Sequence, residues 1–367
     1  MSKKTISYSS SVDYSIADPV KILAQKEGQA TSKNLPFGFK EVIGTRGESA
    51  YVFDMGDCYG ALVQEGLGTK SLIAKAVYAQ TGVSYFANIA IDTVAAIVND
   101  LITVGATPAV VNAYWSMQSY EWFSDIKVAE EFIQGWKKAC DEAGATWGGG
   151  ETQSLPGIIE KGTLEFAGSG FGIINPKDRL TVGKEIHADD AIILFESFGI
   201  HANGVSLARS LADELPDGYQ TKLPSDATYG EALLTPSIVY AKVIQAIYEA
   251  GVDIHYMVHI TGHGWRKLMR HTKALTYRIK EVPPVPEVLQ FIQESVEMSD
   301  EESYGTFNMG AGYAIFVPAM DVEKVLQISN QQDIKAYNAG VVEEGEKQVI
   351  IEPLNITYKK EDLAVRA

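Results

Sequence analysis

The stretch N-I-A-I-D-T-V-A-A-I-V-N-D-L-I-T-V at 88–104 most constrains how this chain can fold. It predicts a long apolar helix that is ended by Gly105 and Pro108. Asp92 and Asp100 stand among isoleucine, valine and alanine, where an acidic group is costly unless it is paired or metal-bound. Two interpretations stay open: a capping or salt-bridged aspartate, or a ligand of Mg²⁺, which prefers oxygen atoms.

Strands and helices are expected to alternate along the rest of the chain. In the first half we expect strands at 58–64, 109–117 and 163–174, and helices at 69–79 and 125–143. In the second half we expect strands at 190–196, 254–260, 274–281, 311–317, 334–343 and 348–352, and helices at 203–214, 236–250, 286–295 and 320–328. The polar, turn-rich stretch 175–184 predicts a boundary near residue 177, so the fold class is α/β (α+β) with two domains, 1–177 and 178–367.

Composition narrows the possible partners. The 367 residues carry a net charge of −16, and because a phosphate-backbone binder needs a basic surface, we expect no nucleic acid partner. No stretch approaches the ~18 uninterrupted apolar residues of a membrane helix, and the start M-S-K-K-T-I-S-Y lacks the apolar core of a signal peptide, so we expect no membrane partner. Two cysteines, Cys58 and Cys140, form no disulfide framework and indicate reduced thiols in the cytoplasm.

A glycine-rich stretch, E-G-L-G-T-K, occupies 65–70. It is not a Walker A loop, because Thr69 separates Lys70 from the last glycine. Gly66 and Gly68 would still let the backbone approach a phosphate, and the following helix N-terminus with Lys70 would favour negative charge. The alternative is a tight strand-to-helix turn without a ligand.

Acidic residues accompany the glycines. Glu65 begins the stretch just described, where a carboxylate repels phosphate unless a cation lies between them. In G-G-G-E-T at 148–152, glycines precede Glu151 and Thr152, which would allow a ligand to approach the backbone beside a metal ligand. A flexible turn is the other interpretation of this segment.

Histidines occur in two segments that could bind a ligand. In I-H-A-N-G at 200–204, His201 and Asn203 stand where a helix begins and could bind an anion, or simply form a turn. His255 and His259 would share one face of a strand about 13–14 Å apart, which is too far for one metal ion. The following T-G-H-G, which holds His263, breaks any helix, so this i, i+4, i+8 spacing predicts no zinc site.

Together and in this order, the motifs resemble those of the AIR synthetase family, also called phosphoribosylformylglycinamidine cyclo-ligase. The matching segments are E-G-L-G-T-K at 65–70, A-I-D-T-V-A-A-I-V-N-D at 90–100, G-G-E-T-Q-S-L-P-G at 149–157, F-G-I-H-A-N-G-V-S-L-A-R at 198–209, L-L-T-P-S-I-V-Y at 233–240, H-I-T-G-H-G at 259–264 and T-F-N-M-G-A-G at 306–312, with a weaker echo in S-Y-S-S-S-V-D-Y at 7–14. The similarity covers nearly the whole chain.

The resemblance implies a fold and a reaction. Two N-terminal domains would pair in a homodimer to form a shared β-barrel, and each C-terminal α/β sandwich domain would complete a cleft that binds ATP and Mg²⁺. The family converts formylglycinamidine ribonucleotide and ATP to aminoimidazole ribonucleotide, ADP and phosphate. The formyl oxygen is phosphorylated, the amidine nitrogen attacks that carbon, and phosphate leaves as the ring closes.

The resemblance also implies roles for individual residues. The implied metal ligands are Glu65, Asp92 and Glu151, with Asp100 beside them. The implied nucleotide-binding residues are Glu65, Gly66, Gly68, Thr69, Lys70, Asp92, Asp100, Gly149, Gly150, Glu151 and Thr152. Lys70, His201 and Asn203 would be catalytic, and His201, Asn203, Thr261 and Asn308 would contact the substrate.

Four positions depart from the family pattern. Glu65 replaces an aspartate, Gln153 and Ser154 replace Ala-Glu, and His263 replaces a glycine. These departures leave two other hypotheses open: an ATP-dependent relative that acts on another phosphorylated small molecule, and a non-catalytic paralogue that binds nucleotide and dimerises. Retention of Asp92, Glu151 and Lys70 together argues against the paralogue.

Overall fold

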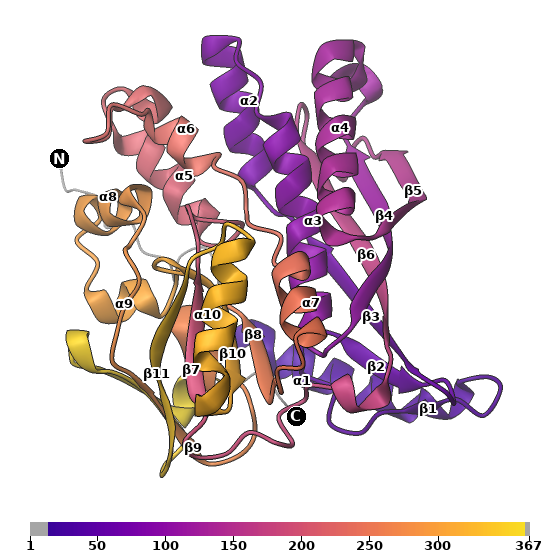
Figure 1. Ribbon diagram of the computed structural model, residues 1–367. Helices are drawn as coiled ribbons and strands as arrows, with labels where there is room; N and C mark the ends of the chain where they lie inside the picture. The colour runs from indigo at the N-terminus through magenta and orange to yellow at the C-terminus, as the bar shows by residue number, and fades with distance from the viewer. Residues whose placement is uncertain (1–13, 364–367) are drawn as a thin grey trace.

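The computed structural model describes residues 14–363 and the side chains of residues 19–363. Within these residues two sheets form two α/β units, which appear in indigo to magenta and in orange to yellow in Figure 1. This arrangement confirms the expected fold class. The motif echo at 7–14 lies outside the described side chains.

The first sheet has six strands. Their order is β1 (Lys40–Glu41), β2 (Tyr51–Asp54), β3 (Tyr59–Gly66), β6 (Leu164–Ile174), β4 (Thr107–Met117) and β5 (Thr146–Ser154). The pairs are antiparallel except β4 with β5. The two edge strands of this sheet are β1 and β5. The helices of this unit are α2 (Lys70–Thr81), α3 (Phe86–Ile102) and α4 (Ile126–Ala143), which lie on the same side of the sheet in Figure 1.

Glycines in β6 bring α3 close to the first sheet. A Cβ atom on Gly168 or Gly170 would lie 2.8 or 2.7 Å from a side-chain atom of Ile97, and one on Gly172 would lie 3.2 Å from Leu101. Because atoms this close would have to shift, the alternating glycines of A-G-S-G-F-G let the apolar face of α3 lie against the strand. The helix predicted at 88–104 is therefore buried where it meets the sheet.

The second sheet has seven strands. Their order is β13 (Ile356–Lys359), β12 (Gln348–Ile351), β9 (Leu275–Ile279), β11 (Ala336–Glu344), β7 (Ala191–Glu196), β10 (Ala311–Val317) and β8 (Tyr256–His259). The helices of this unit are α5 (Val205–Glu214), α6 (Tyr229–Leu233), α7 (Ala241–Glu249), α8 (Glu287–Ser295), α9 (Asp300–Tyr304) and α10 (Val322–Gln331). Short 3₁₀ helices occupy Ser32–Asn34, Tyr120–Ser124, Lys177–Arg179, Gly218–Gln220, Gly264–Met269, Ala319–Asp321, Glu352–Leu354 and Lys360–Asp362.

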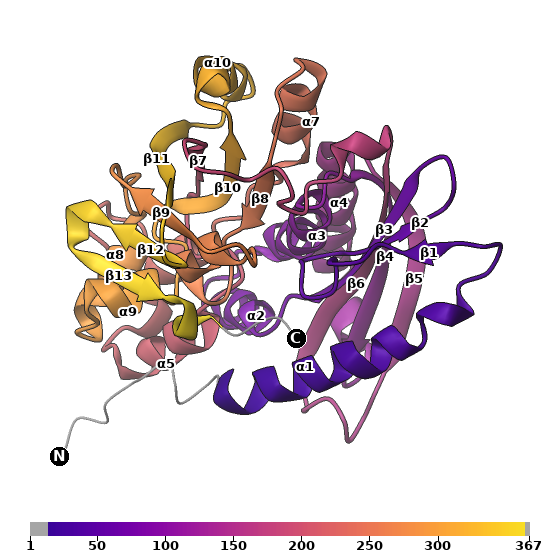
Figure 2. The ribbon, with the colours of Figure 1, turned by 90° about the horizontal axis from the view of Figure 1, so that it is seen from below.

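Helix α1 (Tyr14–Ala30) precedes the first sheet and extends along one side of the molecule in the view of Figure 2. Its described side chains are mostly exposed, including Val20 at 64% and Leu23 at 58%. No helix in the described part of the chain is both long and apolar enough to cross a membrane.

The polar face of α3 joins the two units. Asn88 Nδ2 donates to the carbonyl of Leu234 at 2.9 Å, and Asn99 Nδ2 donates to the carbonyl of Ile238 at 2.8 Å. Asn99 Oδ1 also accepts the backbone N–H of Tyr240 at 3.0 Å. These bonds tie the segment before α7 to α3, and the helix predicted at 236–250 begins only at Ala241.

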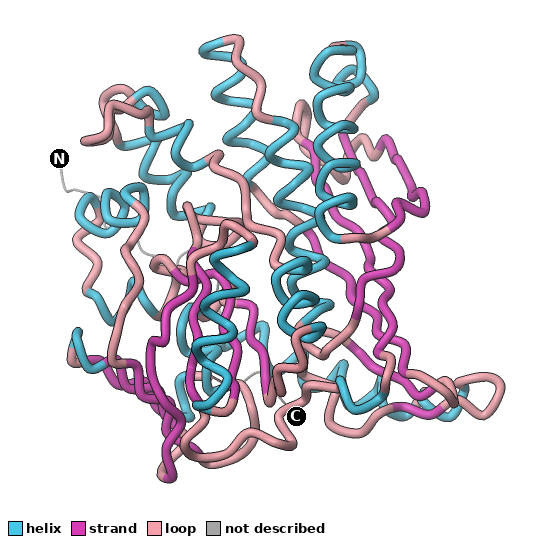
Figure 3. The backbone as a smooth tube through the Cα atoms, in the orientation of Figure 1, coloured by secondary structure: helices cyan, strands magenta, loops and turns pink. Residues whose placement is uncertain are grey.

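The G-G-G-E-T segment is part of a strand, so its interpretation as a turn is wrong (Figure 3). A Cβ atom on Gly150 would lie 2.1 Å from the carbonyl oxygen of Ala113 in β4. Glycine is therefore required here by the close approach of two backbones. This requirement needs no ligand, which removes one reason for expecting a nucleotide at this segment.

Candidate active site

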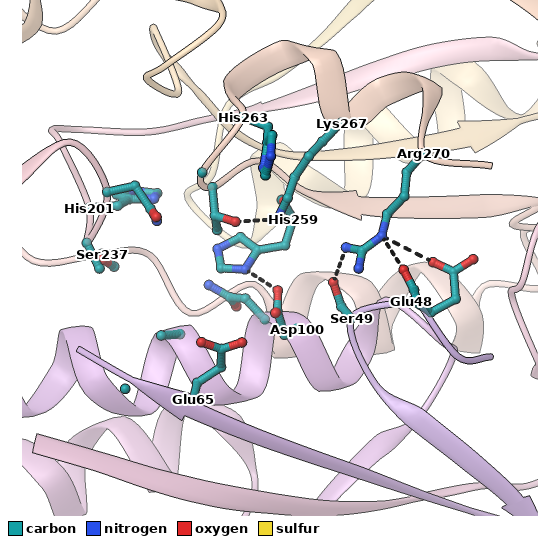
Figure 4. A pocket seen from close by; sticks show the side chains of 18 of the residues that line it. Glu48, Ser49, Glu65, Asp100, His201, Ser237, His259, His263, Lys267 and Arg270 are labelled. Carbon is teal, nitrogen blue, oxygen red and sulfur yellow. Dashed lines mark hydrogen bonds and ion pairs between the residues drawn. The ribbon is translucent and has the colours of Figure 1, made fainter. Parts of the chain in front are cut away.

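A cavity of about 420 Å³ lies where the two units meet. Helix α1, the loop before β2, the end of β3, α3, the loop before α5, and the segment that follows β8 all contribute to it. The lining residues are Lys21, Gln25, Gly47, Glu48, Ser49, Glu65, Gly66, Asp92, Ala96, Asn99, Asp100, His201, Ala202, Asn203, Ser237, His259, Thr261, Gly262, His263, Lys267 and Arg270. Figure 4 shows several of these side chains converging from both units.

The structure brings together only part of the predicted site. The predicted residues that line the cavity are Glu65, Gly66, Asp92, Asp100, His201, Asn203 and Thr261. The predicted residues that do not line it are Gly68, Thr69, Lys70, Gly149, Gly150, Glu151, Thr152 and Asn308. The first group lies where the two units meet. In the second group, four residues lie in β5, Gly68 and Thr69 directly precede α2, and Lys70 and Asn308 bond other residues as described below.

A carboxylate and a histidine meet at the centre of the cavity. Nδ1 of His259, at the end of β8, lies 2.7 Å from Oδ1 of Asp100 in α3 (Figure 4). Burial alone would raise the pKa of Asp100, but the hydrogen bond from His259 and the nearby cations Lys267 and Arg270 lower it to about 2. Burial lowers the pKa of His259, so a neutral imidazole donates its Nδ1–H to an ionised Asp100.

Glu65 lies beside this pair with a different charge state. Burial and the negative charge of Asp100 together raise the pKa of Glu65 to about 8. At neutral pH its carboxyl therefore carries a proton, because a buried carboxylate beside an ionised one is costly to ionise without a cation. A divalent cation bound between Glu65 and Asp100 could replace that proton.

Two cations that the motifs did not indicate, Lys267 and Arg270, also line the cavity. Lys267 Nζ donates to Thr261 Oγ1 and, at 3.3 Å, to the carbonyl of His259. Burial lowers the pKa of Lys267 to about 8. Arg270 donates to the carbonyl of Gly47 at 2.9 Å, and its Nε lies 3.8 Å from Oε2 of Glu48, which balances part of its charge. Together with Lys267 it can still attract a phosphate.

A sequence signal for these two cations existed. Both belong to W-R-K-L-M-R at 265–270, directly after the T-G-H-G motif, and Lys267 lies in the 3₁₀ helix Gly264–Met269 that this motif begins. A basic segment that directly follows a glycine motif indicates residues that can bind an anion beside that motif.

His201 projects an unpartnered imidazole toward the cavity. Neither ring nitrogen has a hydrogen-bond partner among the described residues, although the residue is only 3% exposed. Burial, with smaller contributions from His259 and Lys70, lowers its pKa to about 3, so the ring is neutral. A buried polar group of this kind is costly unless a ligand satisfies it, which supports a binding role for His201.

Lys70 and Asp92 form a buried ion pair. Lys70 Nζ lies 2.7 Å from Oδ2 of Asp92, and both side chains are 0% exposed. Lys70 also donates to the carbonyl of Thr235 at 3.0 Å, while Oδ1 of Asp92 accepts the N–H and the hydroxyl of Ser237. In this structure the lysine neutralises an aspartate and binds the other unit, and it does not face the cavity as a phosphate ligand would.

The predicted metal ligands do not converge within one subunit. Glu151 is exposed on the edge strand β5, which β4 and β6 separate from the strand that carries Glu65. Asp92 is engaged by Lys70 and Ser237, so Glu65 and Asp100 are the predicted acidic residues that remain together in the cavity. An ionised aspartate beside a glutamate whose ionisation is suppressed fits a hard divalent cation with oxygen ligands.

Asn308 has a structural position behind the cavity. Its Oδ1 accepts the hydroxyl of Ser197 at 2.7 Å, and its Nδ2 donates to the carbonyl of Gly199 at 2.8 Å. Both bonds fix the loop that leads to His201. The residue predicted to contact substrate thus positions a cavity residue in this structure.

His263 adopts a backbone conformation that explains the family glycine at this position. Its φ is +70°, in the left-handed region that glycine occupies without strain. The side chain lines the cavity (Figure 4). This departure from the family pattern therefore adds an imidazole to the site.

Comparison with protein families places both units. The family model described as AIR synthase related protein, N-terminal domain, matches residues 47–174, and the model described as AIR synthase related protein, C-terminal domain, matches residues 187–352.

The chain is 35% identical to the phosphoribosylformylglycinamidine cyclo-ligase of Methanobrevibacter smithii over 292 residues, which cover 79% of this chain and 82% of that protein. The fold is similar to the hydrogenase maturation protein HypE in complex with ATP, with a TM-score of 0.60, 16% identity, and 96% of each chain covered. It is also similar to T. maritima PurL complexed with FGAR, with a TM-score of 0.59 and 15% identity over 97% of this chain and 54% of that chain. The chain therefore belongs to the AIR synthase related protein family.

Proposed function

We propose that the protein is an ATP-dependent cyclo-ligase of purine biosynthesis that closes the imidazole ring of formylglycinamidine ribonucleotide. The observation that carries the proposal is the cavity between the two units, which combines a carboxylate pair, a neutral histidine and two cations. The name and the 35% identity of the Methanobrevibacter smithii relative support the same reaction.

ATP and Mg²⁺ are the proposed co-substrate and cofactor. The similarity to a protein solved with ATP supports nucleotide binding. Glu65 and Asp100 would hold the magnesium ion, because burial and the charge of Asp100 together raise the pKa of Glu65, and a cation would favour its ionised form. When bound, magnesium would neutralise charge on the transferring phosphoryl group.

The remaining cavity residues have proposed roles toward the substrate. Lys267 and Arg270 would bind its ribose phosphate, because both are cations that line the cavity. His201, held neutral, would donate a hydrogen bond to the formyl oxygen or orient it, and Asn203 would support the same group. The amidine nitrogen would then attack the activated carbon, and phosphate would leave as the ring closes.

We propose a homodimer formed through the first sheet. The edge strand β5 has no partner on its outer side among the described residues, and Leu62 and Tyr114 of the same sheet are 48% and 36% exposed. An unpaired edge and partly exposed apolar side chains favour association with a second copy. We also propose a domain boundary at 177/178 and a cytoplasmic location.

A relative with another phosphorylated substrate is the second candidate. His263 favours it, because this imidazole enters the cavity where the family pattern has no side chain. ATP would still phosphorylate the substrate in this cavity, but the substrate that fits beside His263 would be a different molecule.

The test is ADP release measured with purified protein, ATP, Mg²⁺ and formylglycinamidine ribonucleotide. Release of ADP together with aminoimidazole ribonucleotide is expected, and omission of the ribonucleotide is the control. ATP binding without ADP release would reject the cyclo-ligase in favour of the altered substrate or the non-catalytic paralogue. Release of ADP with a different phosphorylated small molecule would then identify a relative with an altered substrate.

A further inference from the structure

A cluster of two histidines and an aspartate lies outside the candidate active site. His187, Asp190 and His255 each offer one ligand atom, and these three atoms lie within 4.8 Å of one another. Asp190 directly precedes β7, and His255 directly precedes β8, so two strands on either side of β10 bring the cluster together. The spacing of His255, His259 and His263 gives no sign of this cluster, because His187 and Asp190 lie about 65 residues earlier in the chain.

Asp190 supplies the observation that points to a ligand. Its side chain is 0% exposed, and its Oδ1 accepts no hydrogen bond from the described part of the chain. This oxygen lies 3.4 Å from Nδ1 of His187, while its other oxygen, Oδ2, lies 2.8 Å from Nδ1 of His255. A buried carboxylate oxygen without a donor is costly, and a cation between the two histidines would satisfy it.

The distances suit a small transition-metal ion. Zinc binds histidine nitrogen and carboxylate oxygen at about 2.0–2.2 Å, so neighbouring ligand atoms of a tetrahedral site lie about 3.4 Å apart. The pair His187 Nδ1 and Asp190 Oδ1 already has this separation. His187 Nδ1 also lies 2.7 Å from the carbonyl of Ala188, a contact that a metal at this nitrogen would replace, and the exposed ring can turn.

The surroundings of the cluster include a carboxylate near His255 and a cavity that opens beside it. Oδ2 of Asp253 lies 3.4 Å from Nε2 of His255, the nitrogen opposite the one that faces Asp190. A carboxylate at the far nitrogen of a histidine fixes its tautomer and orientation for metal binding. Asp253 and His255 also line an open cavity of about 840 Å³, through which an ion can enter.

We propose that His187, Asp190 and His255 bind one divalent transition-metal ion of the zinc class, with Asp253 orienting His255. Two imidazoles and one carboxylate select such an ion over Mg²⁺ or Ca²⁺, which prefer oxygen ligands alone. The ion would link the start of β7 to the start of β8 beside the end of β10. This site is separate from the carboxylate pair proposed for the magnesium-bound nucleotide.

Titration of untagged, chelator-treated full-length protein with Co²⁺ and then Zn²⁺, without nucleotide, tests the proposal. The readouts are the visible absorption of tetrahedral Co²⁺ and calorimetry with Zn²⁺. We expect one tight equivalent in the wild type and at least about 10-fold weaker binding in His187→Gln. The exposed Asp189→Asn is the matched control, because it removes an acid beside the cluster at a φ of +74°, which asparagine tolerates, and its binding should be unchanged.

Thermal unfolding in excess chelator checks that His187→Gln is as stable as the wild type without metal. Absence of Zn²⁺ binding in the wild type would overturn the proposal, as would equal affinity in His187→Gln. Equal losses in His187→Gln and Asp189→Asn would show attraction by surface charge alone and would also overturn it. Because the readouts are independent of ADP release, failure here leaves the proposed reaction unaffected.

Discussion

The ammonium of Lys70 lies 2.7 Å from the carboxylate of Asp92, and water reaches neither side chain. The pair connects the N-terminus of α2 to the middle of α3, and both partners also bond the segment of residues 235–237 from the other unit. The residues that a sequence motif assigns to nucleotide binding therefore hold the two units together in this structure.

Lys70→Met should destabilise the protein by about 3–5 kcal/mol, because it leaves Asp92 buried without its cation. The double variant Lys70→Met/Asp92→Asn should be more stable than the sum of the single changes predicts, since it removes both charges. Urea unfolding measures these differences in free energy.

Lys137→Met is the matched control for this prediction. Lys137 pairs with Asp141 on the surface of α4 with a side chain that is 71% exposed, so its loss should cost under about 1 kcal/mol. Equal effects of the two Lys→Met changes would contradict the structural importance of the buried pair.

His201→Ala should lower kcat by at least about 100-fold while leaving the fold intact. No described protein group bonds the imidazole, so its removal breaks no internal hydrogen bond, whereas a positioned proton donor contributes about 10²–10⁴-fold. Since its pKa is about 3, the wild-type pH profile between 5 and 9 should show no step from His201. Steady-state ADP release and circular dichroism measure the two effects, and a normal kcat would exclude the proposed role.

His263→Gly should change KM for the phosphorylated substrate by at least about 3-fold with little effect on kcat, because the imidazole lines the cavity. Its free energy of unfolding should stay within about 1 kcal/mol, since relief of the left-handed backbone at φ +70° offsets lost contacts. Kinetics and urea unfolding of the same preparation provide both numbers. An unchanged KM would show that His263 does not contact the substrate.

The protein should lose stability as pH falls from about 6.5 to 4, partly through His271. Burial lowers the pKa of His271 to about 4 from 6.5. Its Nδ1 accepts the N–H of Lys273 at 3.2 Å, which requires an unprotonated nitrogen. Within this window the unfolded chain binds a proton that the folded chain does not, so the contribution is complete above pH 6.5 and disappears toward pH 4.

His271→Asn is the variant that isolates this effect. Asparagine can still accept the backbone N–H two residues on but does not titrate, so the variant should show a smaller loss of urea midpoint between pH 7.5 and 5. An equal loss in both proteins would assign the pH dependence to other groups.

Cys58 should react with a thiol reagent in the native protein, whereas Cys140 should not. Cys58 is partly exposed, while Cys140 is buried and burial raises its pKa to about 11. Titration with a chromogenic disulfide should therefore detect one thiol before denaturation and two after it. The variant Cys58→Ser should remove the native reaction, and rapid native labelling of that variant would contradict the burial of Cys140.

The sequence by itself determined most of the longer helices and strands, because apolar periodicity and glycine or proline boundaries are local signals. The short elements β1, β2, β13, α6 and α9 were not among those expected. It also indicated residues that share one cavity: Glu65, Asp100, His201 and Thr261 come from four separate motifs and all line it. The motif order was sufficient for the family, since several short patterns in a fixed sequence rarely coincide by chance.

Only the tertiary structure decided what each polar group faces. Ser237 and Tyr240 give their backbone N–H groups to Asp92 and Asn99, so the helix expected from residue 236 starts at Ala241. The glycine at 150 admits the backbone of β4, so a predicted loop is a strand. Each outcome depends on a partner more than 30 residues away, and the pairing of distant groups is set by packing, which no local pattern in the sequence records.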